Sequence, residues 1–290
     1  VFSEYQAGAS TNSALRQKAQ LAQADLGNIE QLPKDTSLKI NKLDKVNSEY
    51  SDFAPMQIGD TLYYSSMRFP LANVAHQPPR VFAKIMYSKS MEKGKVVNFL
   101  DPKDSTHVAH LSFNAPHTRM VFTKCIYLND NVIQCKLYER KLDANGKWSK
   151  PELLPEPINQ QGYTSTHPQL SFDSVSQKEM LYFVSDCPGG SGKMDIWSSE
   201  IKSKAYARPV NLTAVNTPDN EVSPYYDATK NLLYFSSQGR GGLGGYDIFK
   251  YQSGSRKVEN LGTPYNSSFD DLYFITTNRK TDVFFASNRP

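Results

Sequence analysis

The sequence predicts an all-β protein, a β-propeller of four-stranded antiparallel blades, on the basis of three observations. A short apolar run recurs along the chain, a polar phrase precedes most of its copies, and two further short strands follow most of them. Each copy occupies about fifty to sixty residues, and a recurring unit of this kind indicates a repeat architecture. Aromatic residues make up 12% of the chain, which favours strands because flat rings pack well on pleated sheets.

The recurring apolar run is expected to form the second strand of each blade. Its copies are too short and too rich in aromatic and β-branched residues to be helices. They are Leu62–Ser66, Met120–Thr123, Leu181–Ser185, Leu233–Ser237 and Val283–Ser287. The polar phrase leads into the first strand of each blade and is found at Asn47–Pro55, Ser165–Pro168, Asn220–Pro224 and Asn266–Asp271, with a weaker version at Ser105–His110.

Two more short strands complete the unit. The third strands are expected at Ala83–Tyr87, Gln134–Tyr138, Met194–Trp197 and Tyr246–Phe249. The fourth strands are expected at Val96–Phe99, Glu152–Leu154, Pro209–Leu212 and Val258–Leu261. A single sheet of this size cannot bury both of its faces, whereas blades stacked around a ring cover one another. We therefore expect a propeller over residues 37–290.

The number of units predicts five blades. Four complete units are followed by a fifth that stops just after its second strand, at Arg289–Pro290. Residues 37–46 resemble a fourth strand, so we expect them to close the last blade from the N-terminal side. The last blade is then incomplete at its C-terminus, its third strand lies further along a longer polypeptide, and six blades would need one more unit. Residues 1–36 are expected to be a helical segment, either the end of an upstream helical domain or a strap across the propeller.

The overall composition excludes two classes of partner. Lys and Arg number 33 against 29 Asp and Glu, an excess of 33 − 29 = 4 that is too small to favour nucleic acid. The sequence contains no run of about 18 apolar residues, so we expect no membrane span. It also lacks a Gly-x-Ser-x-Gly elbow and a recognisable catalytic triad, so we expect neither an enzyme nor a cofactor.

A glycine-rich loop in the fourth unit formally matches a dinucleotide-binding motif, Gly239–Gly244. That motif must open a helix, yet a strand follows here, so we interpret the loop as structural. Its glycines are expected to adopt positive φ in a tight turn, at Gly241, Gly242, Gly244 and Gly245. Asp247, and Asp195 in the third unit, are expected to accept hydrogen bonds from backbone amides.

Five polar residues occupy about the same place in their units: Asp52, His107, His167, Glu221 and Asp270. They are candidates for a polar ring at one mouth of the central channel that binds a cation or a polar ligand. The alternative is that they form hydrogen bonds that hold the blades together, and this interpretation is favoured. We expect no metal site, because His107 and His110 lie on a strand entry and point in opposite directions.

Cys125 and Cys135 flank a turn centred on Asp130. A hairpin there would place the two residues directly opposite each other, at a distance that a disulfide can bridge. Unpaired thiols are the alternative, and the sequence leaves both open.

The fourth unit resembles a known family through Leu233–Phe249, supported by Val46–Pro55 and Phe285–Pro290. It is similar to the WD40-like repeat of TolB-type propellers, in the form found in large outer-membrane-associated OmpA-family proteins of Bacteroidetes, including those of the type IX secretion system. The resemblance covers about residues 37–290, although the first two units lack the glycine-rich phrase.

This resemblance implies a non-catalytic scaffold in the periplasm, associated with the outer membrane. Its partners would be other proteins of an envelope or secretion complex, and peptidoglycan would be bound only through a domain absent from this chain. Two alternatives are kept. One is the gating propeller of a peptidase or other hydrolase. The other is a glycan-binding propeller, for which Trp148 and Trp197 are the tryptophan candidates.

Overall fold

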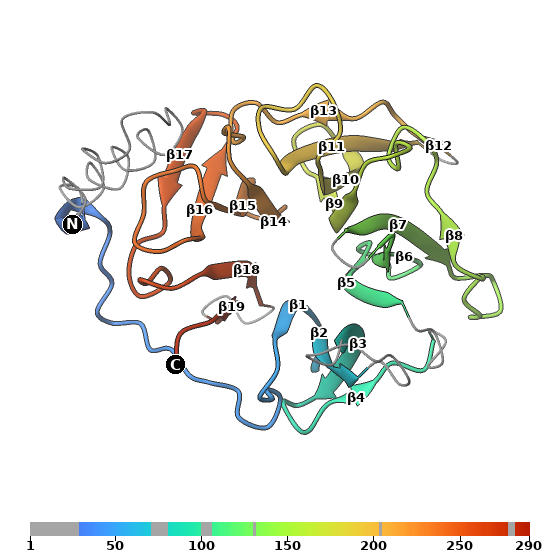
Figure 1. Cartoon of the computed structure of the whole chain (residues 1–290), viewed down its shortest axis with the longest axis horizontal. Coiled ribbons are helices and arrows are strands. Elements are labelled where there is room, and N and C mark those ends of the chain that lie inside the picture. The colour runs from blue at the N-terminus through green and yellow to red at the C-terminus, as the bar shows by residue number, and fades with distance from the viewer. Residues whose placement is uncertain (1–28, 71–80, 100–105, 130–131, 203–204, 278–281) are drawn as a thin grey trace.

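The chain folds into a ring of five antiparallel β-sheets, seen along the ring axis in Figure 1. In this computed structural model the described residues are 29–70, 81–99, 106–129, 132–202, 205–277 and 282–290. The only helical element among them is one short 3-10 turn, η1 (Ile29–Gln31). The prediction of a β-propeller with four-stranded antiparallel blades is confirmed.

Each sheet is one blade, and its strands follow one another from the ring centre outward. Blade 1 contains β1 (Asp52–Ile58), β2 (Thr61–Pro70), β3 (Val81–Lys89) and β4 (Lys95–Val96). Blade 2 contains β5 (His107–Phe113), β6 (Arg119–Tyr127), β7 (Ile133–Lys141) and β8 (Glu152–Leu153). Blade 3 contains β9 (Ser165–Asp173), β10 (Lys178–Ser185), β11 (Asp195–Lys202) and β13 (Val210–Asn211), with the short β12 (Ala205–Tyr206) also beside β11.

The last two blades differ in completeness. Blade 4 contains β14 (Glu221–Asp227), β15 (Leu232–Ser237), β16 (Asp247–Gln252) and β17 (Lys257–Asn260). Blade 5 consists of β18 (Asp271–Thr276) and β19 (Val283–Ser287). The innermost strands β1, β5, β9, β14 and β18 surround the ring centre (Figure 1).

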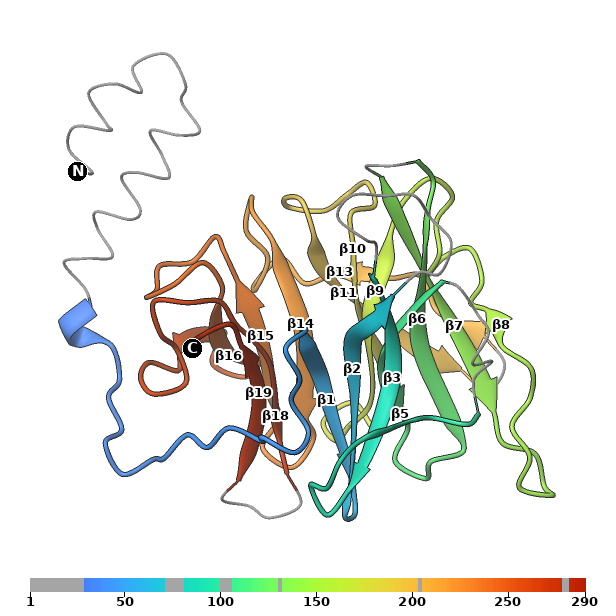
Figure 2. The same cartoon turned by 60° about the horizontal axis from the view of Figure 1, so that its bottom comes forward.

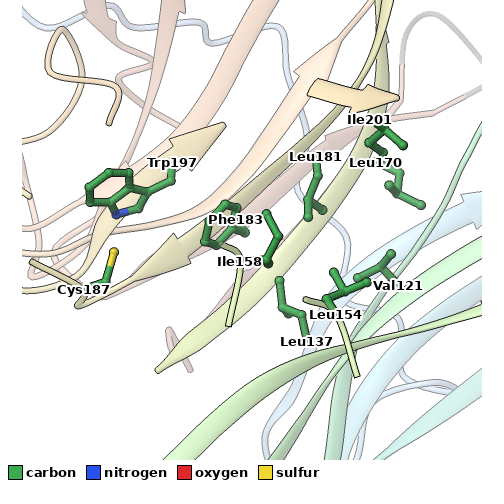
Figure 3. Close-up of a cluster of buried hydrophobic side chains, with 10 residues drawn as sticks. All are labelled: Val121, Leu137, Leu154, Ile158, Leu170, Leu181, Phe183, Cys187, Trp197 and Ile201. Carbon is green, nitrogen blue, oxygen red and sulfur yellow. The ribbon is translucent and has the colours of Figure 1, made fainter. Parts of the chain in front are cut away.

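The hydrophobic core lies between blades rather than within one sheet, because each sheet buries its apolar faces against its neighbours. The cluster in Figure 3 joins blades 2 and 3 and includes Leu137, Leu181 and Phe183, each at most 1% exposed. A second cluster joins blades 3 and 4 through Ile196 and Phe235. The recurring apolar run therefore supplies the side chains that hold the ring together.

The closing strand predicted at residues 37–46 is not formed. This segment has no strand. An isolated β-bridge is formed earlier in the chain, where Lys34 pairs with Thr263 just after β17. In the complete blades a fourth strand pairs with a third strand, whereas β19 occupies the second position. In the part of the chain that the structure describes, the segment thus has no third strand to pair with. The helix predicted within residues 1–36 falls largely on residues 1–28, which lie outside the described residues.

The glycine-rich loops lie where one blade touches the next. A Cβ on Gly244 would overlap the carbonyl oxygen of Phe269 at the entry to blade 5, and one on Gly245 would overlap the Asp270 carboxylate. One on Gly242 would overlap the carboxylate of Asp247. These three glycines have no positive φ, contrary to our expectation. Gly244 is required because the loop approaches the backbone before β18 too closely for a side chain, whereas a side chain at Gly242 or Gly245 would displace a carboxylate.

The two aspartates predicted to hold these loops begin the strands that follow them, Asp247 in β16 and Asp195 in β11. Asp247 Oδ2 accepts hydrogen bonds from the backbone N–H groups of Leu243 at 2.9 Å and Gly244 at 3.0 Å. Asp195 Oδ2 accepts from the side-chain amide of Asn211 at 3.1 Å and from the preceding loop. The carbonyl of Gly241 accepts a hydrogen bond of 3.4 Å from the Asn260 side chain.

Candidate functional site: the central channel

Every innermost strand contains a β-bulge at the same position. The residue at each bulge has a left-handed backbone although it is not glycine, with φ between 46° and 58°. These residues are Ala54, His110, His167, Ser223 and Tyr273. The strand pairing shifts register at the same point in all five blades. Such bulges re-aim side chains and cluster near functional sites, so the channel is the candidate site.

Proline follows three of these bulges, at Pro55, Pro168 and Pro224. A proline in a central strand would cost a ladder hydrogen bond, but an innermost strand has no strand neighbour on its channel side. The inner strands can therefore carry prolines without losing sheet pairing.

Three of the bulge side chains meet at the ring centre and close the channel. The Tyr273 hydroxyl lies 3.2 Å from Nε2 of His110 and 3.2 Å from Nε2 of His167. The two imidazole rings are 4.1 Å apart between centroids, and the Phe53 ring packs against His110 and Tyr273. We refer to His110, His167 and Tyr273 as the channel plug.

The hydrogen bonds fix where the protons of the plug lie. The backbone N–H of Ser223 donates to Nδ1 of His167 at 3.1 Å, so neutral His167 carries its proton on Nε2. That proton is donated to the Tyr273 oxygen, whose own O–H is directed to Nε2 of His110. His110 then carries its proton on Nδ1, 3.4 Å from the Thr166 hydroxyl.

Burial keeps the plug neutral. It lowers the pKa of His167 to about 3, and burial together with the neighbouring His167 holds the pKa of His110 well below its ordinary value. Burial also raises the pKa of Tyr273 above its ordinary value. The plug is thus a network of neutral donors and acceptors at neutral pH.

A cavity of about 890 Å³ lies on one side of the plug, towards the turns that follow the innermost strands. The turns after β1 and β14 lie on the lower side of the ring in Figure 2. All five innermost strands line the cavity. Its polar lining includes Gln57, Asn114, Gln169, Asp227 and Thr276, and its apolar lining includes Met56, Leu111, Phe172, Tyr225 and Ile275.

Two lining side chains are available to a ligand. The Oε1 atom of Gln57 is buried and has no hydrogen-bond partner among the described residues. Leaving such an acceptor unpaired costs about 1–3 kcal/mol, so the Gln57 side chain gains a partner when it turns into the cavity towards a donor on a ligand. Phe172 lies at the rim and is 40% exposed, which leaves its ring free for stacking.

Asp227 is the one carboxylate among the described residues that line the cavity. Burial opposes its ionisation, but hydrogen bonds from the hydroxyl and the backbone N–H of Thr229 outweigh that effect and lower its pKa. Thr276 and Lys230 lie 3.2 Å and 3.5 Å from its Oδ2 atom. Asp227 is therefore a fixed negative charge at the cavity wall.

The five candidates for a polar ring do not lie at equivalent positions. Asp52, His107 and Glu221 begin their innermost strands, on the side of the plug away from the cavity. The residues at that position in the other two blades are Ser165 and Asp271. His167 lies deeper, at a bulge, and Asp270 precedes its strand.

The acidic side chains at the strand entries hold the turns that precede them, whereas His107 contacts β3 of the neighbouring blade. Asp52 accepts hydrogen bonds from Ser48 and pairs with Arg68 at 2.7 Å. Glu221 accepts from Thr217 and Ser237, while burial raises its pKa. Nδ1 of His107 accepts from the backbone N–H of Ala83 at 3.2 Å. The turn before Asp271 repeats the arrangement, since Ser267 donates to its carboxylate.

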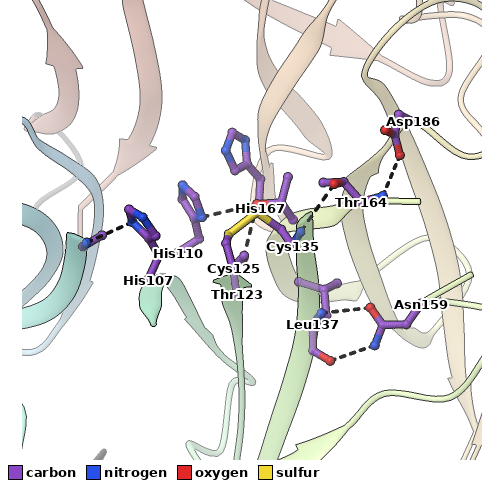
Figure 4. The surroundings of a disulfide bond; sticks show 12 residues. His107, His110, Thr123, Cys125, Cys135, Leu137, Asn159, Thr164, His167 and Asp186 are labelled. Atoms are coloured by element: carbon purple, nitrogen blue, oxygen red, sulfur yellow. Dashed lines mark hydrogen bonds between the residues drawn. A yellow bond between two sulfur atoms is a disulfide. The ribbon is translucent and has the colours of Figure 1, made fainter. Parts of the chain in front are cut away.

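Cys125 and Cys135 face each other across β6 and β7 and are joined by a disulfide, with Cα atoms 4.0 Å apart (Figure 4). The bond lies at the end of blade 2 away from the cavity, near His107. Asp130, at the predicted centre of the turn, lies outside the described residues. The third cysteine, Cys187, is free and buried.

Neither tryptophan reaches the cavity. Trp197 is buried in the cluster between blades 2 and 3, and Trp148 packs against Phe113. In the described ranges, no group of three or more His, Cys, Asp or Glu residues is arranged to hold a metal ion. In the same ranges, no helix has the length and apolar character needed to cross a membrane.

Comparison with known proteins places the fold. No protein-family model and no curated protein sequence matches the chain. Among solved structures it is similar to the xylan β-1,4-xylosidase of Bacillus halodurans, with a TM-score of 0.50 and 13% identity over 83% of this chain and 49% of the xylosidase. It thus spans about half of that enzyme's length.

Two further solved structures are similar but score lower. The endo-arabinase of Bacteroides thetaiotaomicron has a TM-score of 0.47 and 12% identity, over 82% of this chain and 88% of the enzyme. The exo-β-1,3-galactanase of Clostridium thermocellum has a TM-score of 0.46 and 15% identity, over 83% of this chain and 53% of the galactanase. At these identities the similarity shows the fold alone.

The xylosidase neighbour corrects the family prediction. It is a glycoside hydrolase, so the expected resemblance to TolB-type propellers, and to the type IX secretion component PorE in particular, is wrong. The predicted scaffold role in a secretion or envelope complex depended on that resemblance and is wrong with it. The same neighbour contradicts the expectation that the chain is not an enzyme.

Proposed function

We propose that the chain is a glycan-binding propeller whose ligand occupies the central cavity. The observation that carries this proposal is the cavity itself, about 890 Å³ and lined by all five innermost strands. Cavities of this size, mainly apolar with a few placed polar groups, are typical of small-molecule sites.

The lining suits a neutral oligosaccharide better than a charged ligand. A sugar ring offers hydroxyl groups on its edge and C–H groups on its faces. Gln57 and Asn114 supply neutral hydrogen-bonding groups, Asp227 supplies an acceptor for hydroxyl groups, and Phe172 supplies a ring for stacking.

The channel plug argues against the other alternative, the gating propeller of a peptidase or hydrolase. A gate of that kind admits substrate along the ring axis. Here the axis is closed by side chains in mutual contact, with the Tyr273 hydroxyl 3.2 Å from each histidine Nε2. The cavity is therefore a pocket with a floor.

The proposal is limited to binding. Hydrolysis of a glycosidic bond generally uses two carboxyl groups on either side of that bond. Asp227 is the one carboxylate of the described cavity lining, and it is already held by Thr229 and Lys230. Release of reducing sugar is measured beside binding, so that catalysis is tested in the same samples.

The experiment is calorimetric titration with neutral oligosaccharides of xylose, arabinose and galactose. We expect 1:1 binding of at least one of them. Gln57→Leu removes a hydrogen bond worth about 1.4 kcal/mol and should weaken binding about tenfold. Phe172→Ala should weaken it by a similar factor.

Phe269→Ala is the matched control, because Phe269 is also 40% exposed but does not line the cavity. Its affinity should equal that of the wild type. Binding that survives both cavity substitutions, or no binding by any of the three sugar series, would contradict the proposal.

The disulfide supports a further proposal on location, an oxidising compartment such as the periplasm. Disulfides persist in such compartments and are rare in the cytosol. Mass spectrometry of the protein as isolated from its native cells, under non-reducing conditions, should find Cys125 joined to Cys135. Two free thiols would contradict this location.

A further inference from the structure

The fifth blade presents an unpaired strand edge. In the complete blades a third strand lies beside the second, as β11 lies beside β10 and β16 beside β15. Among the described residues, no strand pairs with the outer edge of β19. Every residue of β19 is partly exposed, whereas five of the six residues of β15 are buried. An edge of this kind is ready to pair with another strand.

Blades 3 and 4 show which strand belongs there. In both, a buried aspartate opposite a serine begins the third strand, with Ser185 opposite Asp195 and Ser237 opposite Asp247. Isoleucine and then an aromatic residue follow, at Ile196–Trp197 and Ile248–Phe249. In β19 the corresponding positions are Ser287, Ala286 and Phe285.

A second feature of the complete blades holds the third strand in place. Asn216 accepts a hydrogen bond from the backbone N–H of Ile196 and donates one to its carbonyl, both at 2.9 Å. Asn266 does the same for Ile248, at 2.7 Å and 2.9 Å, and Asn159 for Leu137, at 2.9 Å each. We call this two-bond contact the asparagine clasp.

Asn47 occupies the position of the clasp for the fifth blade. Its backbone N–H donates to the carbonyl of Leu43 at 2.8 Å, as Asn216 donates to Leu212 at 3.0 Å. The next residue also matches, since Ser48 donates to Asp52 as Thr217 donates to Glu221. Asn47 is exposed, whereas Asn216 is 8% exposed, and in the described structure its side chain makes no hydrogen bond.

The apolar surroundings are also in place. Phe284 of β19 packs against a cluster that contains Val46, 3% exposed, together with Leu43 beside Asn47. The β19 edge and the Asn47 turn therefore border the same apolar cluster. The corresponding side chain in the connection before blade 4, Val215, is fully buried against blades 3 and 4.

We propose that the outer edge of β19 is a docking site for one extended polypeptide strand of the pattern Asp-Ile-aromatic, clasped by Asn47. The strand runs antiparallel to β19, with its aspartate opposite Ser287, its isoleucine opposite Ala286 and its aromatic residue opposite Phe285. Main-chain hydrogen bonds supply the affinity, and the clasp together with the apolar cluster sets the register. The site is separate from the cavity proposed for glycans.

The probe is a fluorescent peptide with the sequence of Gly244–Gln252, which contains the third strand of blade 4. We expect saturable 1:1 binding by fluorescence anisotropy. Because the N–H of Asn288 donates to the carbonyl of Asp270, just before β18, the N–H groups of Phe285 and Ser287 point outward. Hydrogen exchange at these two amides should slow when the peptide binds.

Two matched controls distinguish binding at the docking site from non-specific binding of the peptide. A peptide in which aspartate replaces the isoleucine should bind at least tenfold more weakly. Asn47→Ala should also weaken binding about tenfold, while Asn41→Ala, at another exposed asparagine of the same segment, should leave it unchanged.

Three results would overturn the proposal. One is equal affinity for wild type and Asn47→Ala. Another is exchange protection in β15 or β16 instead of β19, which would mean that the peptide replaces its parent strand. The third is a stable dimer in light scattering that the peptide does not dissociate, because a second copy of the chain would then cover the edge.

Discussion

The channel plug should make the fold sensitive to acid. His110 and His167 are half-buried beside the cavity and neutral, with pKa values below those of the unfolded chain. Protonation therefore favours the unfolded state. The stability that depends on these two residues is complete above about pH 6.5 and is lost as the pH falls towards about 3.

The size of the effect follows from the linkage between protonation and folding. A histidine that is neutral in the fold and has its ordinary pKa in the unfolded chain lowers the free energy of unfolding by about 1.4 kcal/mol for every pH unit below about 6. Between about pH 7.5 and pH 5 this amounts to about 2 kcal/mol per histidine, or about 4 kcal/mol for the pair. Such a loss is a large fraction of the stability of an ordinary domain.

The assay is urea denaturation of the wild type and His167→Asn across this pH range. Asparagine tolerates the left-handed backbone of position 167, where φ is 46°, and its Oδ1 atom replaces the acceptor Nδ1. The variant should be less stable than the wild type at neutral pH. Below about pH 6, its free energy of unfolding should fall by about 1.4 kcal/mol less per pH unit than that of the wild type. Exposed His117, with a φ of 54°, supplies the control His117→Asn, whose slope should match the wild type. Equal slopes for wild type and His167→Asn would refute the account of the plug.

Two further predictions concern blade contacts and the disulfide. Gly244→Ala should cost about 1–3 kcal/mol of unfolding free energy, because its Cβ would overlap the carbonyl of Phe269. Gly254→Ala, where a Cβ meets nothing within 4 Å, should be neutral, and equal melting temperatures for the two variants would count against this explanation of the loop. Cys125→Ser with Cys135→Ser should cost about 2–3 kcal/mol in the chain-entropy picture, since the bond closes a loop between residues 10 apart. An unchanged denaturation midpoint after that substitution would show that the bond adds no stability.

The repeats were sufficient to predict the blades because a second strand is recognisable by its composition. Leu181–Ser185 and Leu233–Ser237 are apolar runs whose side chains fill the spaces between sheets, and this requirement recurs in each blade. Residues 37–46 were misinterpreted because a connector can share the composition of a strand. The Leu43–Asn47 turn of this connector repeats the turn at Leu212–Asn216. The two segments therefore share a turn and not a pairing with a third strand.

The site was harder to predict because it depends on a small shift in register. His167 and Asp270 were aligned with Glu221, whereas Ser165 and Asp271 hold the equivalent places. A recurring pattern would have corrected the placement of Asp270. In it, Asn is followed by Ser or Thr and then, four residues later, by Asp or Glu. Asn216, Thr217 and Glu221 follow this pattern, and Asn266, Ser267 and Asp271 match them. The bulges leave no comparable signal, because a left-handed histidine or tyrosine is imposed by tertiary packing.

The central claim, that the cavity holds a glycan, is tested most directly by a crystal structure of the protein with the oligosaccharide that binds best in solution. The account predicts electron density for the sugar inside the ring, within hydrogen-bond distance of Gln57 Oε1 and with one ring face against Phe172. Sugar bound on an outer face of the blades, with the cavity holding water alone, would contradict it.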